Sequence, residues 1–290
     1  MNHSSDVAIV VDSAASLPQE VIDHPRMQIA PMRLSIDGKT YLDREEIAPD
    51  EFYRLLKQAK EMPTTSAPSP AGFVEAIRRA ENTCGAVLCI TVGARFSASH
   101  DAATLAAEEI KSSNSDMQIS VLDSESAAGG QGLVAMEAWR AAVDGATLGQ
   151  VISTATKVVR NVGLLAYVDT FYYLWKGGRV PMIARVGASL LKIKPIFQLR
   201  DGEIKTIARP RTRRKAVRRL FELMAEHVGD HKVKATVMHA DALDSAQELA
   251  KRVESEFDCE DLYVSEFTPV MGAHIGPGLV GIAFWATDSS

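Results

Sequence analysis

Residues 86–93 read AVLCITVG, five consecutive apolar side chains followed by a threonine and, two positions later, a glycine. Continuous apolar runs of this length that end in a polar turn are typical of parallel strands buried on both faces. Residues 7–11 (VAIVV) and 119–122 (ISVL) have a similar character and lead into Asp12-Ser13 and Asp123-Ser124. The three runs therefore predict strands of one buried sheet.

Helical patterns separate these runs, and strand, helix, strand at this spacing predicts a parallel α/β sheet. Beyond residue 160 the pattern changes to short strands between helices, and the turn at 200–203 (RDGE) is a hairpin signal. We expect an α/β protein with an N-terminal three-layer parallel-sheet domain (1–160) and a C-terminal two-layer α/β domain with a mixed sheet (161–290). The expected helices cover residues 49–60, 71–80, 99–111, 133–143, 148–161, 212–228 and 245–257, and the later strands 164–168, 195–199, 204–207, 235–239, 261–267 and 280–285.

The composition is ordinary for a folded, water-soluble chain. The 290 residues are 46% hydrophobic and 24% charged, with a net charge of −5 that gives no overall attraction to nucleic acid or to an anionic membrane. No long apolar segment or signal sequence is evident, and the three cysteines form no CxxC pair, so we expect reduced thiols and no structural metal. We expect a cytoplasmic protein without stable membrane insertion.

Four polar, glycine-bearing motifs stand out against this background. They are PTTSAPSP (63–70), FSAS (96–99), KGGR (176–179) and MGAHIGPG (271–278). Hydroxyls, a histidine, an arginine and glycines that let backbone amides approach are the groups that a carboxylate or phosphate needs. Because ligands of α/β sheets bind beyond the carboxyl ends of strands, we expect these motifs to form one anion site.

Each motif also has a purely structural interpretation. Ser97 or Ser99 could cap the following helix, and the hydroxyls of residues 64–66 could belong only to a rigid turn before two prolines. His274, framed by glycines, favours an anion-facing role. The GGQG segment at 129–132 lacks dinucleotide-binding spacing, so it predicts close helix–strand packing instead.

A basic run, RPRTRRK at 209–215, precedes and opens an expected helix. It could be a solvated helix start, but cations are unfavourable at a helix N-terminus, which favours an external anion or an acidic partner. No interleaved aromatic side chains or nucleic-acid-binding motif accompany it, so we expect no nucleic-acid partner.

Taken together, the motifs resemble the DegV family, two-domain fatty-acid-binding proteins that present an acyl chain to a fatty-acid kinase. The resemblance covers nearly the full chain, although Ala67 and His100 stand where the family commonly has glutamine and tyrosine. Its marks are VDS (11–13), TTSAPS (64–69), FSAS (96–99), DS (123–124), LWKGGR (174–179), KP (194–195), RTR (211–213) and HIGPG (274–278).

The resemblance implies a DegV-like fold and a long-chain fatty acid bound between the two domains. It implies that Thr65, Ser66, Ser97 and His274 surround the fatty-acid carboxylate. By the same resemblance, Arg179, Arg211 and Gly276 lie near the head group or the kinase-facing surface.

We expect a carrier without catalysis or cofactor of its own, because the chain has no Gly-x4-Gly-Lys-Ser/Thr loop to hold a nucleotide. A partner kinase would then form the acyl phosphate. The alternative is a serine hydrolase of acyl esters, with Ser97 as nucleophile, His274 as base and Asp123 as the residue that orients the base. Ser97 lies in no Gly-x-Ser-x-Gly motif, which disfavours this alternative.

Overall fold

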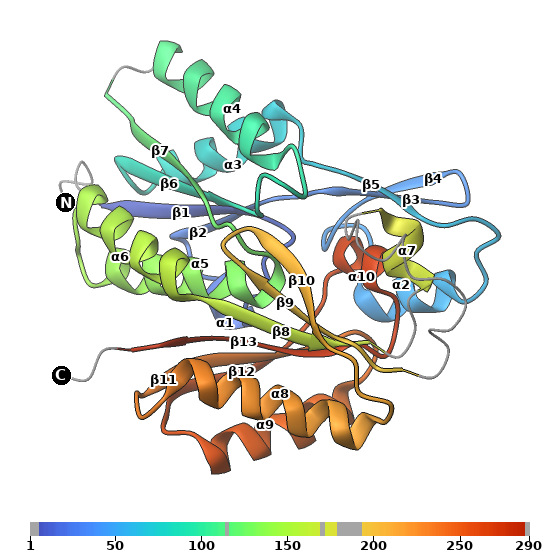
Figure 1. Ribbon diagram of the computed structural model, residues 1–290. Helices are drawn as coiled ribbons and strands as arrows, with labels where there is room; N and C mark the ends of the chain where they lie inside the picture. The colour runs from blue at the N-terminus through green and yellow to red at the C-terminus, as the bar shows by residue number, and fades with distance from the viewer. Residues whose placement is uncertain (1–5, 114–115, 169–171, 179–192, 288–290) are drawn as a thin grey trace.

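The computed structural model describes residues 6–113, 116–168, 172–178 and 193–287. Its first sheet has the strand order β2-β1-β6-β7, and all its strands are parallel. Helices α3 and α4 cover one face of this sheet, and α5 and α6 cover the other (Figure 1). The predicted three-layer arrangement is confirmed. Its elements are β1 (Val7–Asp12), β2 (Met27–Ala30), β6 (Ala86–Thr91), β7 (Gln118–Asp123), α3 (Pro70–Glu81), α4 (Ser99–Ser113), α5 (Ala128–Val143) and α6 (Leu148–Asn161).

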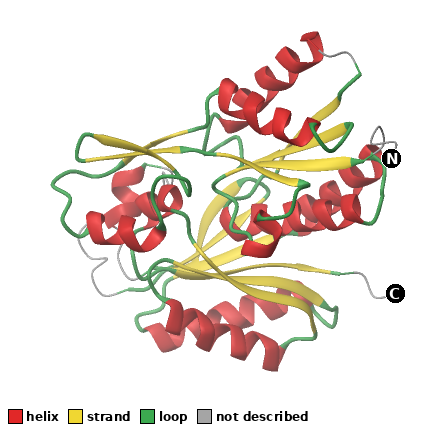
Figure 2. Cartoon of the chain, turned by 180° about the vertical axis from the view of Figure 1, so that it is seen from behind, coloured by secondary structure: helices red, strands yellow, loops and turns green. Residues whose placement is uncertain are grey.

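The second sheet is mixed, with the order β10-β9-β8-β13-β11-β12. Only β11 and β12 pair in parallel within it, and β9 and β10 form the hairpin that the sequence predicts. Helices α8 and α9 cover its outer face, as Figure 2 shows from behind. Its elements are β8 (Gly163–Tyr167), β9 (Ile196–Arg200), β10 (Glu203–Ala208), β11 (Val233–His239), β12 (Cys259–Glu266), β13 (Val280–Ala286), α8 (Arg213–Val228) and α9 (Leu243–Glu256).

Helix α5 lies between the two sheets and contacts β1 and β6 on one side and β8, β11 and β13 on the other. Its glycines make this approach possible. A β-carbon added to Gly129 would lie 2.5 Å from Cγ2 of Thr236, and one added to Gly132 would lie 2.3 Å from the carbonyl oxygen of Ser16. The close packing predicted for the GGQG segment is confirmed.

The helix begins at Ala128, five residues before the predicted start at 133. Glycine disfavours helix in isolation, but burial between two sheets outweighs that preference here. The prediction from local sequence was wrong for this turn because the stabilising contacts are long-range.

A third sheet, β4-β3-β5, is antiparallel and was not predicted. Its strands have only three or four residues, too few to show a clear alternation of polar and apolar side chains. Residues 64–66, for which a rigid turn was one interpretation, form β5. The remaining elements are α1 (Gln19–Ile22), β3 (Arg33–Ile36), β4 (Lys39–Leu42), α2 (Pro49–Leu56), β5 (Thr64–Ser66), α7 (Tyr172–Gly177) and α10 (Pro269–Ile275).

The predicted boundary near residue 160 falls at the connection from α6 to β8. One hydrophobic cluster crosses it and contains Val11 and Leu133 together with Met238 and Trp285. Two sheets therefore share part of one core, and the division into domains at this point stays a prediction.

We expect Gly132→Ala to lower the free energy of unfolding by about 1–3 kcal/mol, because the new methyl group would press against a backbone oxygen. Gly149→Ala is the control: this glycine is exposed near the start of α6, with nothing within 4 Å of an added β-carbon. The control should be neutral or stabilise by up to about 1 kcal/mol. Urea denaturation of both variants measures the difference, and equal stabilities would contradict the packing role of Gly132.

Candidate functional site

A cavity of about 570 Å³ opens where the carboxyl ends of β1 and β6 approach α7, β10 and α10. Its walls are largely apolar, and residues from both halves of the chain contribute to them. The lining residues are Ala14, Met32, Thr65, Ser66, Ala67, Val92, Arg95, Phe96, Ser97, Ala98, Ala127, Leu174, Ile204, Val270, Met271, His274 and Ile275. Three of the four polar motifs predicted to form one site are therefore represented here.

Thr65 and His274 meet in this cavity although 209 positions separate them in the chain. Thr65 is the middle residue of β5 and pairs with Leu34 of β3, so its side chain projects away from those of its strand neighbours. A hydrogen bond of 2.7 Å joins Thr65 Oγ1 to His274 Nε2. Both residues are half-buried, which lets them contact a ligand and each other.

His274 lies on helix α10, an element that the sequence analysis did not predict. Pro269 opens this helix, Thr268 caps it by accepting a hydrogen bond from the Met271 amide, and Gly276 ends it. Gly272 lets the helix pack closely, because a β-carbon there would lie 2.7 Å from the Tyr53 hydroxyl. The ring of His274 is thus placed by a helix, and its anion-facing role stays a prediction.

Ser97 lies in the loop between β6 and α4. Its hydroxyl oxygen accepts a hydrogen bond from the Ser99 amide at 3.2 Å and lies 2.9 Å from the Ser99 hydroxyl oxygen. Serving a backbone amide at the helix start and facing the cavity are therefore compatible roles for Ser97.

Two buried or half-buried carboxylates hold the strand-end loops. Asp12 accepts hydrogen bonds from the Val92 amide at 2.8 Å and from the Gln131 side chain at 3.1 Å. Burial raises the pKa of Asp12, while these hydrogen bonds oppose the shift. Asp123 accepts from the amides of Ala94 and Glu125. Both side chains shape the loops around Ser97 and do not line the cavity.

This placement does not support the hydrolase alternative. The carboxylate of Asp123 is bonded to its own and the neighbouring loop, and the Nε2 atom of His274 is bonded to Thr65. A triad would need Asp123 to orient the imidazole and the imidazole to take the proton of Ser97. The described contacts instead arrange hydroxyl and imidazole groups around the cavity.

The other predicted residues lie at different distances from this cavity. Ser66 is exposed and lines it, and Arg211 is exposed in the turn before α8. Gly276 is buried against the ring of Tyr173 and does not line it. Arg179 lies outside the described residues. These positions leave the roles of Arg179, Arg211 and Gly276 near a head group as predictions.

Arg95 lines the cavity and was not singled out from the sequence. Its guanidinium forms an ion pair with Glu203 of β10, with 2.9 Å between Nη1 and Oε1. The signal that could have found Arg95 is its position two residues before Ser97 in the loop after a buried strand. Its side chain joins the loop that carries Ser97 to β10 at the edge of the cavity.

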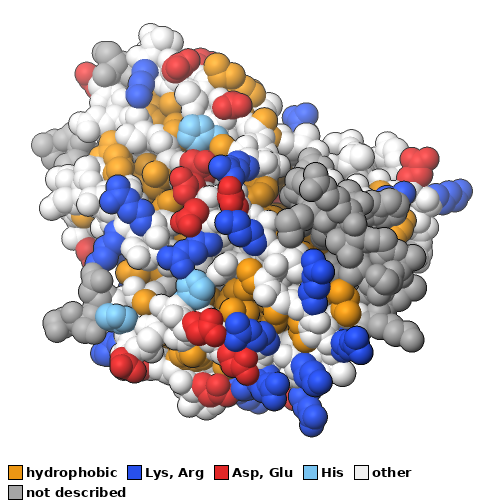
Figure 3. Space-filling model, viewed as in Figure 1, with side chains coloured by type: hydrophobic (Ala, Val, Ile, Leu, Met, Phe, Trp, Pro, Cys, Tyr) orange, Lys and Arg blue, Asp and Glu red, His pale blue; other side chains and the backbone are white. Residues whose placement is uncertain are grey.

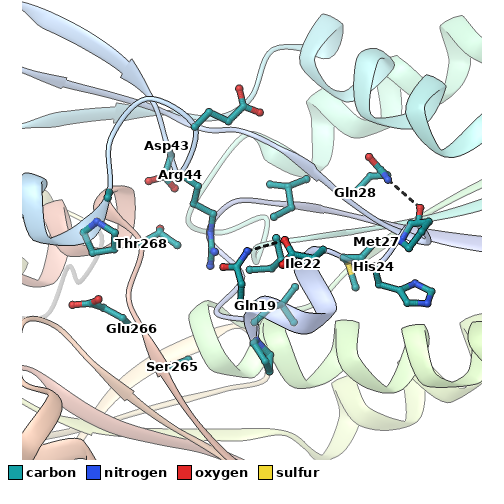
Figure 4. A pocket seen from close by; sticks show the side chains of 18 of the residues that line it. Gln19, Ile22, His24, Met27, Gln28, Asp43, Arg44, Ser265, Glu266 and Thr268 are labelled. Carbon is teal, nitrogen blue, oxygen red and sulfur yellow. Dashed lines mark hydrogen bonds between the residues drawn. The ribbon is translucent and has the colours of Figure 1, made fainter.

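A second, larger cavity of about 780 Å³ lies on the other side of the loop that follows β1. Figure 4 shows Arg44 extended into it toward Gln19, with Glu266 and His24 at its edges. None of Thr65, Ser97 and His274 lines it. Its charged lining would lose hydration against an acyl chain, so the smaller cavity is the better lipid site.

In the described part of the chain, no helix is long and apolar enough to cross a membrane. No cluster of three or more histidine, cysteine or acidic side chains among those residues is arranged to hold a metal ion.

The fold and the smaller cavity define a class of α/β proteins in which both halves of the chain line a largely apolar cavity that also contains hydroxyl and imidazole groups. The model of the family described as "Uncharacterised protein, DegV family" matches residues 6–287. The chain therefore belongs to the DegV family.

Sequence relatives and solved structures both match this chain over nearly its whole length. A DegV domain-containing protein of Streptomyces coelicolor is 34% identical over 281 residues, covering 96% of this chain and 98% of the relative. A fatty-acid-binding DegV family protein from Thermus thermophilus superimposes with a TM-score of 0.89 at 27% identity, covering 97% of this chain and 100% of its own. DegV of Bacillus subtilis, also a fatty-acid-binding protein, gives 0.86 at 27% identity, covering 98% and 100%.

We expect Gly276→Ala to destabilise the end of α10. Gly276 has a φ of 70°, and a β-carbon there would lie 2.0 Å from Cδ2 of Tyr173. Gly145→Ala is the control, because Gly145 has a φ of 86° just after α5 but no described atom within 4 Å of an added β-carbon. The free energy of unfolding should fall about 1–3 kcal/mol further in Gly276→Ala than in the control. Calorimetry that finds equal losses would assign the whole effect to backbone strain.

Proposed function

We propose that this protein binds a long-chain fatty acid in the smaller cavity, with the carboxylate held by Thr65, Ser66, Ser97 and His274. The observation that carries the proposal is the joining of Thr65 to His274 in a largely apolar cavity that Ser97 also lines. DegV family proteins of 27% identity and the same fold bind fatty acids, which supports it.

The two parts of such a ligand meet different needs. Each methylene buried against the apolar walls contributes about 0.8 kcal/mol, so the tail supplies most of the affinity. The carboxylate needs hydrogen-bond donors, because a buried anion without partners is costly. If His274 donates its Nε2 proton to Thr65, the Thr65 hydroxyl proton is left to donate to the carboxylate.

We further propose that the protein is a cytoplasmic carrier and that a separate fatty-acid kinase forms the acyl phosphate. Two features support a partner: the absence of a nucleotide-binding loop from the sequence, and the basic segment before and within the first turn of α8. Figure 3 shows Lys and Arg side chains gathered over this end of α8. Arg179, Gly276 and Arg211 would lie near the head group or the kinase.

The charges of this segment differ in how they are compensated. Arg218 and Arg219 form ion pairs with Glu222, which lies on the same helix. Among the described residues, Arg213 and Arg214 have no acidic partner, and they lie at the positive end of the helix. An acidic surface on a kinase would relieve this unfavourable arrangement and speed encounter.

The purified protein should carry a fatty acid that mass spectrometry of an organic extract identifies. Thr65→Val combined with Ser97→Ala should weaken fatty-acid binding by about 1–3 kcal/mol, because the carboxylate loses two donors. Thr64→Val, on the opposite face of the same strand, is the matched control and should bind like the wild type. Calorimetric titration measures all three, and equal affinities would remove both hydroxyls from the site.

Arg213→Glu with Arg214→Glu should slow acyl-phosphate formation in a reconstituted kinase assay and leave fatty-acid affinity unchanged. The expected loss is largest at low salt, since steering between charged surfaces is screened by ions. The control reverses two exposed charges on other helices, Arg78→Glu with Lys111→Glu, for the same change in net charge. Equal rates for both double variants would place the kinase surface elsewhere.

A further inference from the structure

Asp43 is a buried carboxylate that joins three segments of the chain. It follows β4 directly and has no exposed surface. Its Oδ2 accepts a hydrogen bond from the Ser13 hydroxyl at 2.6 Å, and its Oδ1 accepts one from the Val270 amide at 3.2 Å. Its own amide donates to the carbonyl oxygen of Met32 at 2.9 Å. We call Asp43, Ser13 and Val270 the carboxylate clasp.

The clasp lies in the wall between the two cavities. Ala14 and Val270 line the smaller one, whereas Asp43 and Thr268 line the larger one, where Figure 4 shows them side by side. Asp43 therefore does not line the cavity that we assign to the fatty acid. It holds two of its walls, the loop after β1 and the first turn of α10, from behind.

Helix α10 transmits this contact to the site. Val270 is in its first turn and His274 in its last, and the helix is only seven residues long. A helix of only two turns moves as a rigid body, so a shift of its first turn also shifts its last turn. Displacement of Val270 from Asp43 would shift the His274 ring relative to Thr65.

We propose that Asp43 is a positioning residue for the fatty-acid site, holding α10 so that His274 and Thr65 face the carboxylate together. This inference rests on the proposed function for its consequence, but the clasp itself can be measured without a lipid.

A carboxylate suits this position better than its amide. Ionised Asp43 offers an acceptor oxygen to each of two donors, and hydrogen bonds to a charged acceptor are stronger than neutral ones. An asparagine would fill the same space but present one oxygen and one NH₂ group. One of the two donors, Ser13 or Val270, would then lose its acceptor.

The same carboxylate costs the fold stability. Burial raises the pKa of Asp43 to about 6, against the hydrogen bonds of Ser13 and Val270, the charge of Arg44 and a smaller contribution from the Thr268 side chain. The folded state thus holds the proton more tightly than the unfolded chain, so stability falls as pH rises from about 4 to 6. The other charged or titratable groups that line the cavity with Asp43 are Asp23 and His24 after α1, Glu45, Arg79 of α3 and Glu266 of β12.

Replacing Asp43 by asparagine should remove the energetic cost of the buried charge while weakening the contacts that position α10. At pH 7.5 this variant should unfold at a temperature no lower than the wild type, since the cost of ionisation is gone. Its fatty-acid affinity should nevertheless fall about tenfold, and hydrogen exchange at the Val270 amide should speed up by a similar factor. Ser13→Ala, which leaves the carboxylate ionised, should show a smaller loss of affinity.

Glu45→Gln is the matched control, because Glu45 is exposed beside the same cavity and takes no part in the clasp. It should change neither affinity nor exchange. The ratio of wild-type to Asp43→Asn affinity for palmitate should approach one as the pH falls from 7.5 to 5, because protonated Asp43 resembles asparagine. Titration of the fatty-acid carboxylate in solution affects both measurements equally and cancels in this ratio.

Unchanged affinity and unchanged Val270 exchange in Asp43→Asn would overturn the proposal. A loss of affinity accompanied by a lower unfolding temperature would also overturn it, because the affinity loss would then be explained by general destabilisation of the fold. If the wild type itself binds no palmitate, the proposed function fails. The positioning role of Asp43 is then tested without a lipid, by hydrogen exchange at the Val270 amide and by the ¹⁵N chemical shift of the His274 ring. Both should change in Asp43→Asn and remain at their wild-type values in Glu45→Gln.

Discussion

Glycines on α5 set the distance between the two sheets. Side chains at Gly129 and Gly132 would collide with β11 and with the loop after β1, so only a bare backbone permits this separation. The close approach brings the carboxyl ends of β1 and β6 beside β10 and α10. The cavity is the space left where these edges meet, which is why its walls come from both halves of the chain.

The polar groups of the site are held by local bonds that differ from one segment to the next. Thr65 is fixed by strand pairing, Ser97 by the amide of Ser99, and His274 by a capped helix. Buried Asp12 and Asp43 then tie the supporting loops to one another. Such bonds lower the cost of ordering the site when a ligand arrives, because the groups are already in place.

The sequence was sufficient for most strands of the two larger sheets and for most helices, because apolar runs and capped amphipathic patterns depend on neighbours in the chain. It failed for β2 to β5, which are too short to show a period, and for α10, a seven-residue helix in which Gly272 permits close packing against Tyr53. The pairing of Thr65 with His274 and the clasp at Asp43 depend on contacts between distant segments. A resemblance could indicate the first, but no local pattern indicates the second.

The shared walls of the cavity have a consequence for the amount of folded protein. The ion pair between Arg95 and Glu203 is an exposed bridge between the two halves beside this cavity, and water and salt weaken such a bond. A ligand enclosed by both halves would hold them together. At a free ligand concentration one hundred times the dissociation constant, it would add about 2.7 kcal/mol to the free energy of unfolding. The empty protein would then be the form that proteases degrade first, so the lifetime of the protein would follow the supply of the ligand.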